Sequence, residues 1–175
     1  ARAVAFLATR LFDEFHEDHG LSRRDRLLLE TTALLHDIGL FVGLRAHHKH
    51  AQYLISASEI FGLTSDDKGV IANVARYHRG ALPQRSHLPY IALDRQDRVR
   101  VNKLAAILRV ANALDAEHAQ KIRGLTVRRE ENGWVLDVDG TGDLSLERIA
   151  AEARADLFLD VFGKRLLVRG AGVQT

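Results

Sequence analysis

The sequence predicts a mainly α-helical protein that ends in a small ββαβ unit. Over roughly the first 120 residues, apolar residues recur every three or four positions, which is the period of amphipathic helices. After about residue 122, apolar and polar residues alternate instead, which is the period of strands. With 175 residues, of which 46% are hydrophobic and 27% charged, the chain is long enough to bury a core.

The first two helices have boundaries that can be read from the sequence. Residues 3–16 place their apolar side chains on one stripe, and Gly20 follows as a stop. The next stretch, "LSRRDRLLLETTALLHDIG", has Ser22 in the N-cap position and Gly39 at its end. We therefore expect helices over residues 3–16 and about 22–39.

Three further helices are expected at about residues 49–60, 65–79 and 96–118. The first of them follows the irregular segment "FVGLRAHH". The segment "GALPQRSHLPY" contains both prolines, which favours an ordered loop between helices. With the first two helices, these make a helical domain over residues 1–122.

The remainder, residues 123–175, is expected to form the small α+β unit. "LTVRRE" and "WVLDVDG" alternate apolar and polar residues and flank "ENG", which predicts a β-hairpin. Ser145 is expected to cap a helical stretch that continues through Phe162, and "RLLVRG" is typical of a last strand. We expect Trp134, the only tryptophan, to anchor the core of this unit.

Composition narrows the classes of function. The chain has no cysteine, which excludes disulfides, thiolate zinc sites and cysteine nucleophiles. It has neither an apolar run of about 18 residues nor the pattern of a secretory signal, so a cytoplasmic location is expected. It also has no methionine, which indicates a processed chain or a piece of a longer protein.

Charge and histidine are concentrated in the helical domain. The formal net charge is +2, but residues 1–124 carry +4 and residues 125–175 carry −2. All nine histidines lie in the first of these segments. An anionic ligand or a metal ion is therefore expected to bind there.

Several polar residues occupy special places in the helical domain: His36, Asp37, His47, His48, His50, His78, Asn112 and Asp115. Imidazole and carboxylate suit first-row transition metals, which can orient water and neutralise phosphate charge. Adjacent residues on a helix point about 100° apart. His36 and Asp37 can therefore share one ion only if a cleft surrounds the helix end and other helices supply the remaining ligands.

These motifs resemble a known family. "LLHDIG", "ARYHRG" and "ILRVANALDAEH" resemble the HD superfamily of metal-dependent phosphohydrolases. More closely, "ALLHDIGLFVGLRAHHKHAQYLISASEIFGLTSDDKGVIANVARYHRGALP" looks like the C-terminal region of the exopolyphosphatase and guanosine pentaphosphate phosphatase (Ppx/GppA) family. The resemblance covers roughly residues 3–170 and implies an HD-like helical domain followed by a small α+β unit.

The resemblance implies a divalent metal site formed by His36, Asp37, His78 and Asp115. Two departures affect this ligand set. Asn112 stands where the HD pattern has its last aspartate, and the start of the chain, "ARAVAF", lacks the histidine of the first helix.

The resemblance also implies an accessory role. In full-length members, two actin-like domains before this region hold the phosphate loops and the catalytic glutamate, and the whole enzyme is expected to use Mg²⁺. This chain contains no strand followed by a glycine-rich phosphate loop. The region is therefore expected to support dimerisation and to guide polyphosphate or guanosine pentaphosphate, with little or no activity alone.

A polyanion of this kind carries about one negative charge per phosphate, so arginine, lysine and protonated histidine can hold it by charge-assisted hydrogen bonds. The candidate residues come from "LRAHHKH" and "ARYHRG": Arg45, His47, His48, Lys49, His50, Arg76, His78 and Arg79.

Simpler explanations remain open for the same residues. Backbone groups at a helix end could satisfy His36 and Asp37. Arg76, His78 and Arg79 could interact only with the dipole at the end of a helix. The histidines of residues 47–50 could lie in a solvated loop.

Two other functions compete with the accessory role. One is a self-standing HD-type metal-dependent phosphohydrolase acting on nucleotides or phosphoesters. The other is a nucleic-acid binder, suggested by the sequence pI of about 9.2. The second is weaker, because the chain has no basic helical stripe and few aromatic residues for base stacking.

Overall fold

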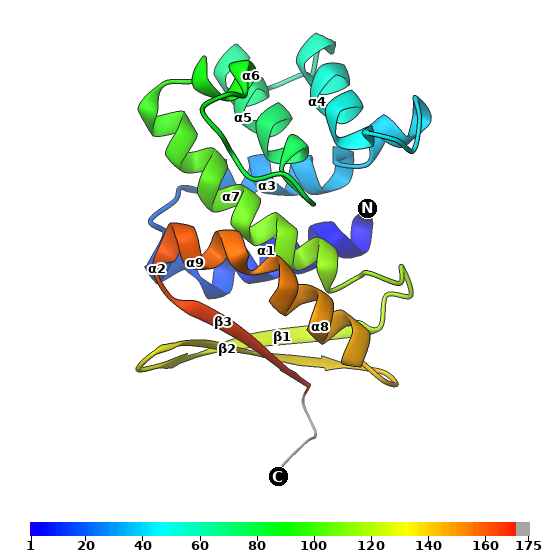
Figure 1. The fold of residues 1–175 in the computed structure, drawn as a ribbon, viewed down its shortest axis with the longest axis vertical. Coiled ribbons are helices and arrows are strands. Elements are labelled where there is room, and N and C mark those ends of the chain that lie inside the picture. Colours follow the sequence, from blue (N-terminus) through cyan, green and yellow to red (C-terminus); the bar gives the residue numbers. More distant parts are fainter. Residues whose placement is uncertain (171–175) are drawn as a thin grey trace.

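The computed structural model describes residues 1–170, and the last five residues lie outside the described part of the chain. Its elements are α1 (Arg2–Glu14), α2 (His16–His19), α3 (Arg23–Leu35), the 3₁₀ helix η1 (Ile38–Phe41), α4 (His47–Ala57), α5 (Ser65–Arg76), α6 (Leu88–Ile91), α7 (Arg95–Ala113), β1 (Ile122–Glu130), β2 (Gly133–Gly140), α8 (Ser145–Arg154), α9 (Asp156–Phe162) and β3 (Arg165–Gly170). Figure 1 shows the helices stacked above a small sheet. The prediction of a mainly α protein with a small α+β unit is confirmed.

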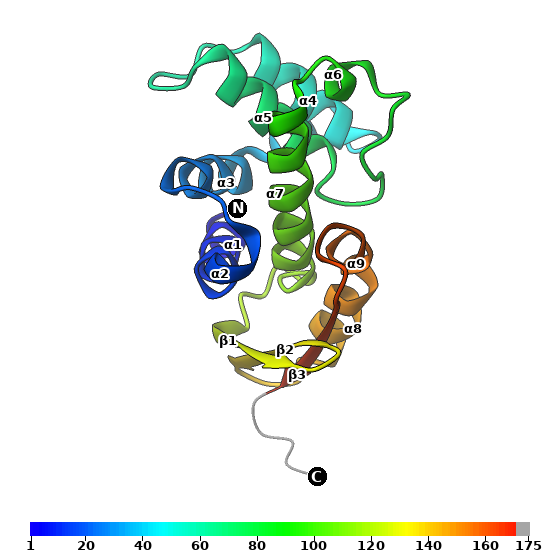
Figure 2. The same cartoon turned by 90° about the vertical axis from the view of Figure 1, so that its left-hand side faces the viewer.

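The central element is α7. It packs against α1, α3 and α5 on the side of the helical body and against α8 and α9 on the other side (Figure 2). The side chain of Asp94 caps its start by accepting a hydrogen bond from the backbone N–H of Asp97 at 2.7 Å. From Leu104 to Ala111 every residue is buried, so this helix is surrounded by other elements along its second half.

Two capping boxes fix the starts of α3 and α5. Ser22 caps α3 with Asp25, which confirms the predicted N-cap, and Thr64 caps α5 with Asp67 in the same way. Both aspartates are buried and also accept hydrogen bonds from arginines of neighbouring helices: Arg100 donates to Asp25 at 2.6 Å, and Arg24 donates to Asp67 at 2.6 Å. The caps therefore join helices as well as starting them.

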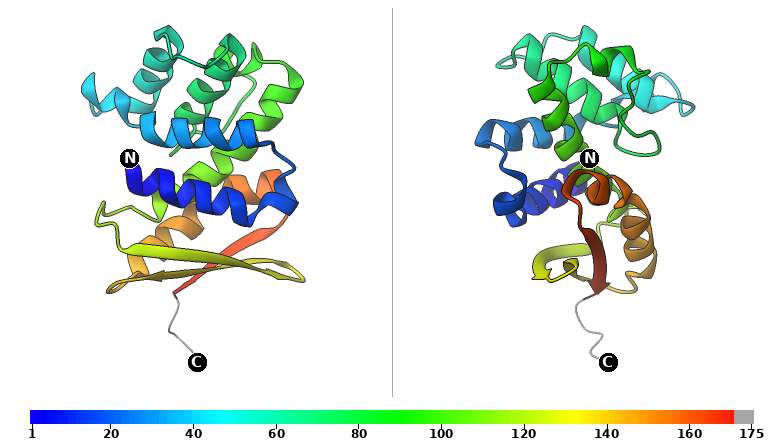
Figure 3. Two further views of the ribbon diagram at one scale, coloured as in Figure 1. Left: turned by 180° about the vertical axis from the view of Figure 1, so that it is seen from behind. Right: turned by 60° about the vertical axis from the view of Figure 1, so that its left-hand side comes forward.

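The sheet has the order β1-β2-β3. The hairpin of β1 and β2 is antiparallel and closes at Glu130 and Gly133, as predicted, whereas β2 and β3 are parallel. The connection between the parallel strands runs through α8 and α9, which lie between the sheet and α7. The left view of Figure 3 shows α1 alongside the sheet, next to β1.

Several helices end earlier than the sequence predicts. The second helix ends at Leu35, where the ring of His36 turns back to the carbonyl of Ala33, and η1 follows. The last helix of the body ends at Ala113 rather than near residue 118. The stretch expected from Ser145 to Phe162 is two helices, which meet at Ala155. Ser145 is the first residue of α8 and not its N-cap, which is Leu144, because the Ser145 hydroxyl donates back to Asp143.

One continuous core joins the helical body to the small unit. Trp134 is 3% exposed and makes edge contacts with Phe158 and Phe162 of its own unit, which confirms its predicted role. It also meets Phe15 of the helical body, with ring centroids 5.2 Å apart. The division of the chain at residue 122 stays a prediction. Within the described range, no helix has both the length and the apolar character needed to cross a membrane.

Candidate functional site

Three helix ends meet at a cluster of histidines around one aspartate. His36 and Asp37 follow the last residue of α3, His47 is the first residue of α4, and His78 lies two residues after the end of α5. The three histidines are buried, with exposed fractions of 0%, 6% and 1%, while the side chain of Asp37 is 34% exposed. We call these four residues the histidine cluster. Its one open side is at Asp37.

Backbone carbonyls fix the orientation of all three rings. Each Nδ1 lies near the carbonyl oxygen three residues earlier: His36 to Ala33 at 2.7 Å, His47 to Leu44 at 3.1 Å and His78 to Ala75 at 2.6 Å. A carbonyl oxygen only accepts, so in each ring Nδ1 must carry the proton and donate. In a neutral ring the lone pair is then on Nε2.

The three Nε2 atoms lie near the carboxylate of Asp37, and those of His47 and His78 also lie near each other. His36 Nε2 is 3.2 Å from Oδ2 of Asp37, and His78 Nε2 is 3.6 Å from Oδ1. His47 Nε2 is 3.8 Å from the same Oδ1 and 3.4 Å from Nε2 of His78. Donor atoms of His36, Asp37 and His78 all lie within 4.8 Å of one another. The sequence-predicted pair at "LLHDIG" is therefore joined by residues from two other helices.

The ionisation states follow from these surroundings. The contact with His36, together with the nearby rings of His78 and His47, lowers the pKa of Asp37 to about 2. Burial lowers the pKa of His78 to about 3. Near neutral pH the site therefore presents an ionised carboxylate and a neutral His78 ring.

This arrangement fits a metal ion. Within residues 1–170, the buried Nε2 of His36 has no hydrogen-bond partner, and a buried acceptor without a partner is costly. A tetrahedral ion with bonds of 2.0–2.1 Å separates its ligand atoms by about 3.3 Å, close to the spacings found here. Bound there, an ion of this kind would act as a Lewis acid toward phosphate oxygens.

Asp115 does not join the cluster. Asp115 is buried at the end of α7, where its Oδ1 accepts a hydrogen bond from the backbone N–H of Gln120 at 3.0 Å. Its other oxygen lies 3.9 Å from Nδ1 of His118. Asn112 lies on the last turn of α7. Of the four metal ligands expected from the sequence, the structure thus brings together His36, Asp37 and His78.

The residues expected to bind polyphosphate fall into two groups. His47 and His78 are buried in the histidine cluster. The others remain at the surface, fully or in part: Arg45, His48, Lys49, His50, Arg76 and Arg79.

Positive charge gathers around His48. Partial burial and the charges of Arg76, His47, Lys49 and Arg79 lower the pKa of the His48 ring. Lys49 and His48 follow His47 on α4, whereas Arg76 and Arg79 flank His78 at the end of α5. We call His48, Lys49, Arg76 and Arg79 the basic rim.

Sequence reasoning missed three residues that support the site. Ala46 has φ of 59°, a left-handed conformation that a residue with a Cβ rarely adopts, and it directly precedes His47. Gly39 lies so close to α4 that a Cβ there would be 1.9 Å from the carbonyl oxygen of His47. No periodicity or motif in the sequence reports either feature.

The third missed residue is Arg109, which is 1% exposed and lies in the second half of α7. Its guanidinium donates to the carbonyl oxygens of Tyr77 and Arg79, and it also donates to both carboxylate oxygens of Asp156 at 2.9 and 3.1 Å. Arg109 therefore fastens the segment after α5, which carries His78 and Arg79, to the start of α9.

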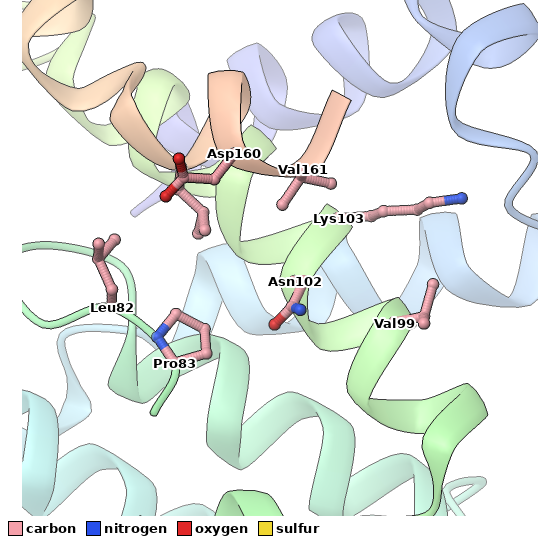
Figure 4. Close-up of a pocket in the computed structure, with 8 residues that line it drawn as sticks. Leu82, Pro83, Val99, Asn102, Lys103, Asp160 and Val161 are labelled. Atoms are coloured by element: carbon pink, nitrogen blue, oxygen red, sulfur yellow. The ribbon is translucent and has the colours of Figure 1, made fainter. Parts of the chain in front are cut away.

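The structure also has a cavity of about 380 Å³ away from this cluster. It is lined by Leu82, Pro83, Val99, Asn102, Lys103, Leu157, Asp160 and Val161. In Figure 4, Lys103 extends away from Asp160. Its Nζ donates to the carbonyl of His19 at 2.5 Å, and Asn102 accepts a hydrogen bond from Tyr90 at 2.9 Å. Lys103 and Asn102 thus serve the fold, and the histidine cluster is the better candidate site.

Comparison with known proteins agrees with the motifs. Residues 1–146 match the family model "Ppx/GppA phosphatase, domain III". Similar proteins include two that are named guanosine-5'-triphosphate,3'-diphosphate pyrophosphatase. The one from Pseudoalteromonas translucida is 32% identical over 112 residues, which are 62% of this chain and 22% of that protein. The one from Vibrio parahaemolyticus is 33% identical over 109 residues, or 60% of this chain and 22% of that protein.

The chain spans about a quarter or less of the length of these relatives. The match to the family model, in contrast, covers most of the chain, and it includes the histidine cluster and the basic rim. The chain therefore belongs to the Ppx/GppA phosphatase family and contains its domain III.

Proposed function

We propose that this chain is the accessory C-terminal region of a phosphoanhydride hydrolase and that it binds a polyanionic phosphate substrate through the basic rim. The observation that carries the proposal is a contact between two segments that bear cations. Nε2 of His47, which His48 and Lys49 follow, lies 3.4 Å from Nε2 of His78, which lies between Arg76 and Arg79. These cations come from the start of α4 and the end of α5, two helices that pack against each other. Like charges held together in this way favour an anionic ligand.

The substrate class is inorganic polyphosphate or guanosine pentaphosphate. The names of the relatives favour the second, because guanosine-5'-triphosphate,3'-diphosphate is guanosine pentaphosphate. Both carry several phosphates in close succession, which arginine and lysine can hold by charge-assisted hydrogen bonds. Hydrolysis belongs, in this proposal, to Mg²⁺-dependent actin-like domains that precede this region in the whole cytoplasmic protein.

A binding titration with matched variants tests this proposal. Lys49→Gln combined with Arg79→Gln should weaken polyphosphate binding about tenfold or more, because two charge-assisted contacts are lost. Arg95→Gln combined with Arg123→Gln removes the same charge from two exposed positions outside the basic rim and should change the affinity little. Equal losses in the two double variants would show non-specific attraction and reject the basic rim as the binding surface.

We also propose that the region supports a homodimer. The support is the apolar segment around η1, where Phe41 is 93% exposed and Leu44 is 79% exposed. Contiguous exposed apolar side chains often mark protein interfaces. Light scattering should report a dimer for the parent chain and a monomer after Phe41→Ser with Leu44→Ser, whereas a monomeric parent would contradict the proposal.

A second candidate function is a self-standing HD-type phosphohydrolase acting on nucleotides or phosphoesters. The convergence of three imidazoles on Asp37 favours it, because such a site can hold a catalytic metal. Release of phosphate by the purified chain in the presence of Mn²⁺ or Zn²⁺, at a rate near that of whole family enzymes, would establish this function and overturn the accessory role. Absence of release would leave the accessory role in place.

A further inference from the structure

We propose that Arg109 and Asp156 are positioning residues for the basic rim, because they tie the segment that carries Arg79 to the small α+β unit. Through them, binding of a polyanion at the rim depends on α9, a helix that contributes no cation to the rim. The effect on binding rests on the proposed polyphosphate-binding function, whereas the link between the two parts of the chain stands on the geometry alone.

The segment after α5 lies outside the helices and strands. α5 ends at Arg76 and α6 begins at Leu88, and residues 79–84 belong to neither a helix nor a strand. Lys49 and Arg76 of the basic rim, in contrast, lie within helices. Among the cations of the rim, Arg79 is therefore the one whose position depends most on contacts from other elements.

Arg109 supplies such contacts from inside the protein. Its side chain is 1% exposed, and its Nη1 donates to the carbonyl oxygens of Tyr77, at 3.2 Å, and of Arg79. The carbonyl oxygen of Ala81 lies 3.4 Å from the same nitrogen. Three alternate carbonyls thus surround one nitrogen, so the backbone of residues 77–81 curves around the guanidinium.

The other arm of the guanidinium binds the small unit. Its Nη2 donates to both carboxylate oxygens of Asp156, at 2.9 and 3.1 Å. Asp156 is the first residue of α9, and its Oδ1 also accepts a hydrogen bond from the backbone N–H of Leu157 at 2.8 Å. Arg154 of α8 donates to the carbonyl oxygen of Arg79 at 3.5 Å. The small unit therefore holds the segment both directly and through Arg109.

The charges of Arg109 and Asp156 are also matched. Burial lowers the pKa of the Arg109 guanidinium, and the carboxylate of Asp156 opposes that shift. Loss of the carboxylate would leave a buried cation without its counter-charge, which is costly. We expect the guanidinium to move toward water in that case, so that the carbonyl oxygen of Arg79 loses its fixed donor.

Positioning and simple attraction predict opposite effects of one substitution. Asp156→Asn removes a negative charge, so attraction alone would strengthen the binding of a polyanion. If Arg79 loses its position, binding should weaken instead, although every cation of the basic rim is still present. Asp160→Asn is the matched control, because it removes the same charge from an exposed residue one turn further along α9.

Polyphosphate titration of the 175-residue chain measures the effect on binding. Asp156→Asn should weaken binding about threefold or more, because a charge-assisted contact is lost, whereas Asp160→Asn should leave binding equal or slightly tighter. Asp156→Glu keeps the carboxylate and should retain most of the affinity, and circular dichroism confirms that the helices persist in each variant. Binding that is equal or tighter in Asp156→Asn would overturn the positioning role.

A double-mutant cycle assigns the effect to Arg79. In a chain that already carries Arg79→Gln, Asp156→Asn should change the affinity by less than about 1.5-fold, because the cation that Asp156 positions is gone. A loss of the same size with and without Arg79→Gln would show general damage to the chain and would overturn the inference.

Trypsin cleavage after Arg79, followed by mass spectrometry, tests the link without any ligand. Asp156→Asn should speed this cleavage at least about fivefold relative to the parent and to Asp160→Asn, because a segment that opens more often is cut faster. Equal rates would overturn the link. If the parent binds no polyphosphate while the cleavage rates differ as expected, the proposed function fails and the link stands, so the two failures are distinguishable.

Discussion

At the scale of single residues, Asp67 combines two tasks that are usually separate. It completes the capping box of α5, where its carboxylate accepts from the backbone N–H of Thr64 at 3.0 Å, and it accepts from Arg24 of α3 at 2.6 Å. Its side chain is only 9% exposed. The helix start and the contact between the two helices therefore depend on one ionised carboxylate.

We predict that Asp67→Asn lowers the free energy of unfolding by about 1–2 kcal/mol at pH 7, as loss of a helix cap does. Hydrogen bonding from Arg24 lowers the pKa of Asp67 below its ordinary value of 3.8. The carboxylate stabilises the fold fully above about pH 4 and progressively less as the pH falls through the lowered pKa. Urea unfolding of both chains should therefore give a difference that shrinks below pH 3.8.

Asp66→Asn is the control, because Asp66 lies in the same first turn but is exposed. Its effect should stay within about 0.5 kcal/mol at pH 7. A loss from Asp67→Asn that is the same at pH 7 and at low pH would show that ionisation of this carboxylate does not contribute.

The candidate site was only partly predictable at this scale. The motifs "LLHDIG" and "ARYHRG" were enough to name His36, Asp37 and His78, because histidine and aspartate are residue types that bind metal ions. His47 was expected to bind phosphate and instead lies in the cluster, since its direction depends on the backbone of Ala46. Asp115 was expected in the cluster and instead binds a backbone group, a choice that spacing along α7 does not reveal.

At the scale of elements, the site depends on how closely η1 approaches the start of α4. Gly39 lies at the contact, and a Cβ there would come within 1.9 Å of the His47 carbonyl oxygen and 2.6 Å of the Ala51 backbone nitrogen. Both are backbone atoms, which cannot turn aside as a side chain can. The two elements would have to separate, which would move His47 away from Asp37.

We therefore predict that Gly39→Ala lowers the free energy of unfolding by about 3 kcal/mol, at the upper end for overpacking. Gly43→Ala is the control, because a Cβ there meets no atom of residues 1–170 within 4 Å. Thermal unfolding monitored by circular dichroism measures the stability of both variants. Equal melting temperatures for Gly39→Ala and Gly43→Ala would contradict the close contact.

The elements themselves were largely predictable, because amphipathic period, caps and turn residues are local signals. Ser22 and the "ENG" turn were placed correctly for this reason. The helix ends were less predictable, since they depend on tertiary contacts. The break at Ala155, for example, places Asp156 at the start of α9, where it pairs with Arg109 of α7, and nothing local to residues 145–162 indicates that partner.

At the scale of the whole molecule, the helical body and the small α+β unit share their core. Phe15, which follows α1, packs against Trp134 of β2 and Phe158 of α9, with ring centroids 5.2 and 4.9 Å apart. All three side chains are at most 3% exposed. Arg109 adds a polar link from α7 to Asp156. These contacts cross the boundary near residue 122, so the two parts are expected to stabilise each other.

We predict that the two parts unfold in one cooperative transition. Trp134, the only tryptophan, reports on the small unit by fluorescence, while far-ultraviolet circular dichroism reports mainly on the helices. The two urea curves should therefore coincide. Phe15→Ala removes a ring at the shared core and should lower the free energy of unfolding by about 3–5 kcal/mol, shifting both curves together. Phe61→Ala, at a ring that is 107% exposed, should shift neither. A fluorescence transition at lower urea than the loss of helix would instead show that the small unit unfolds independently of the helical body.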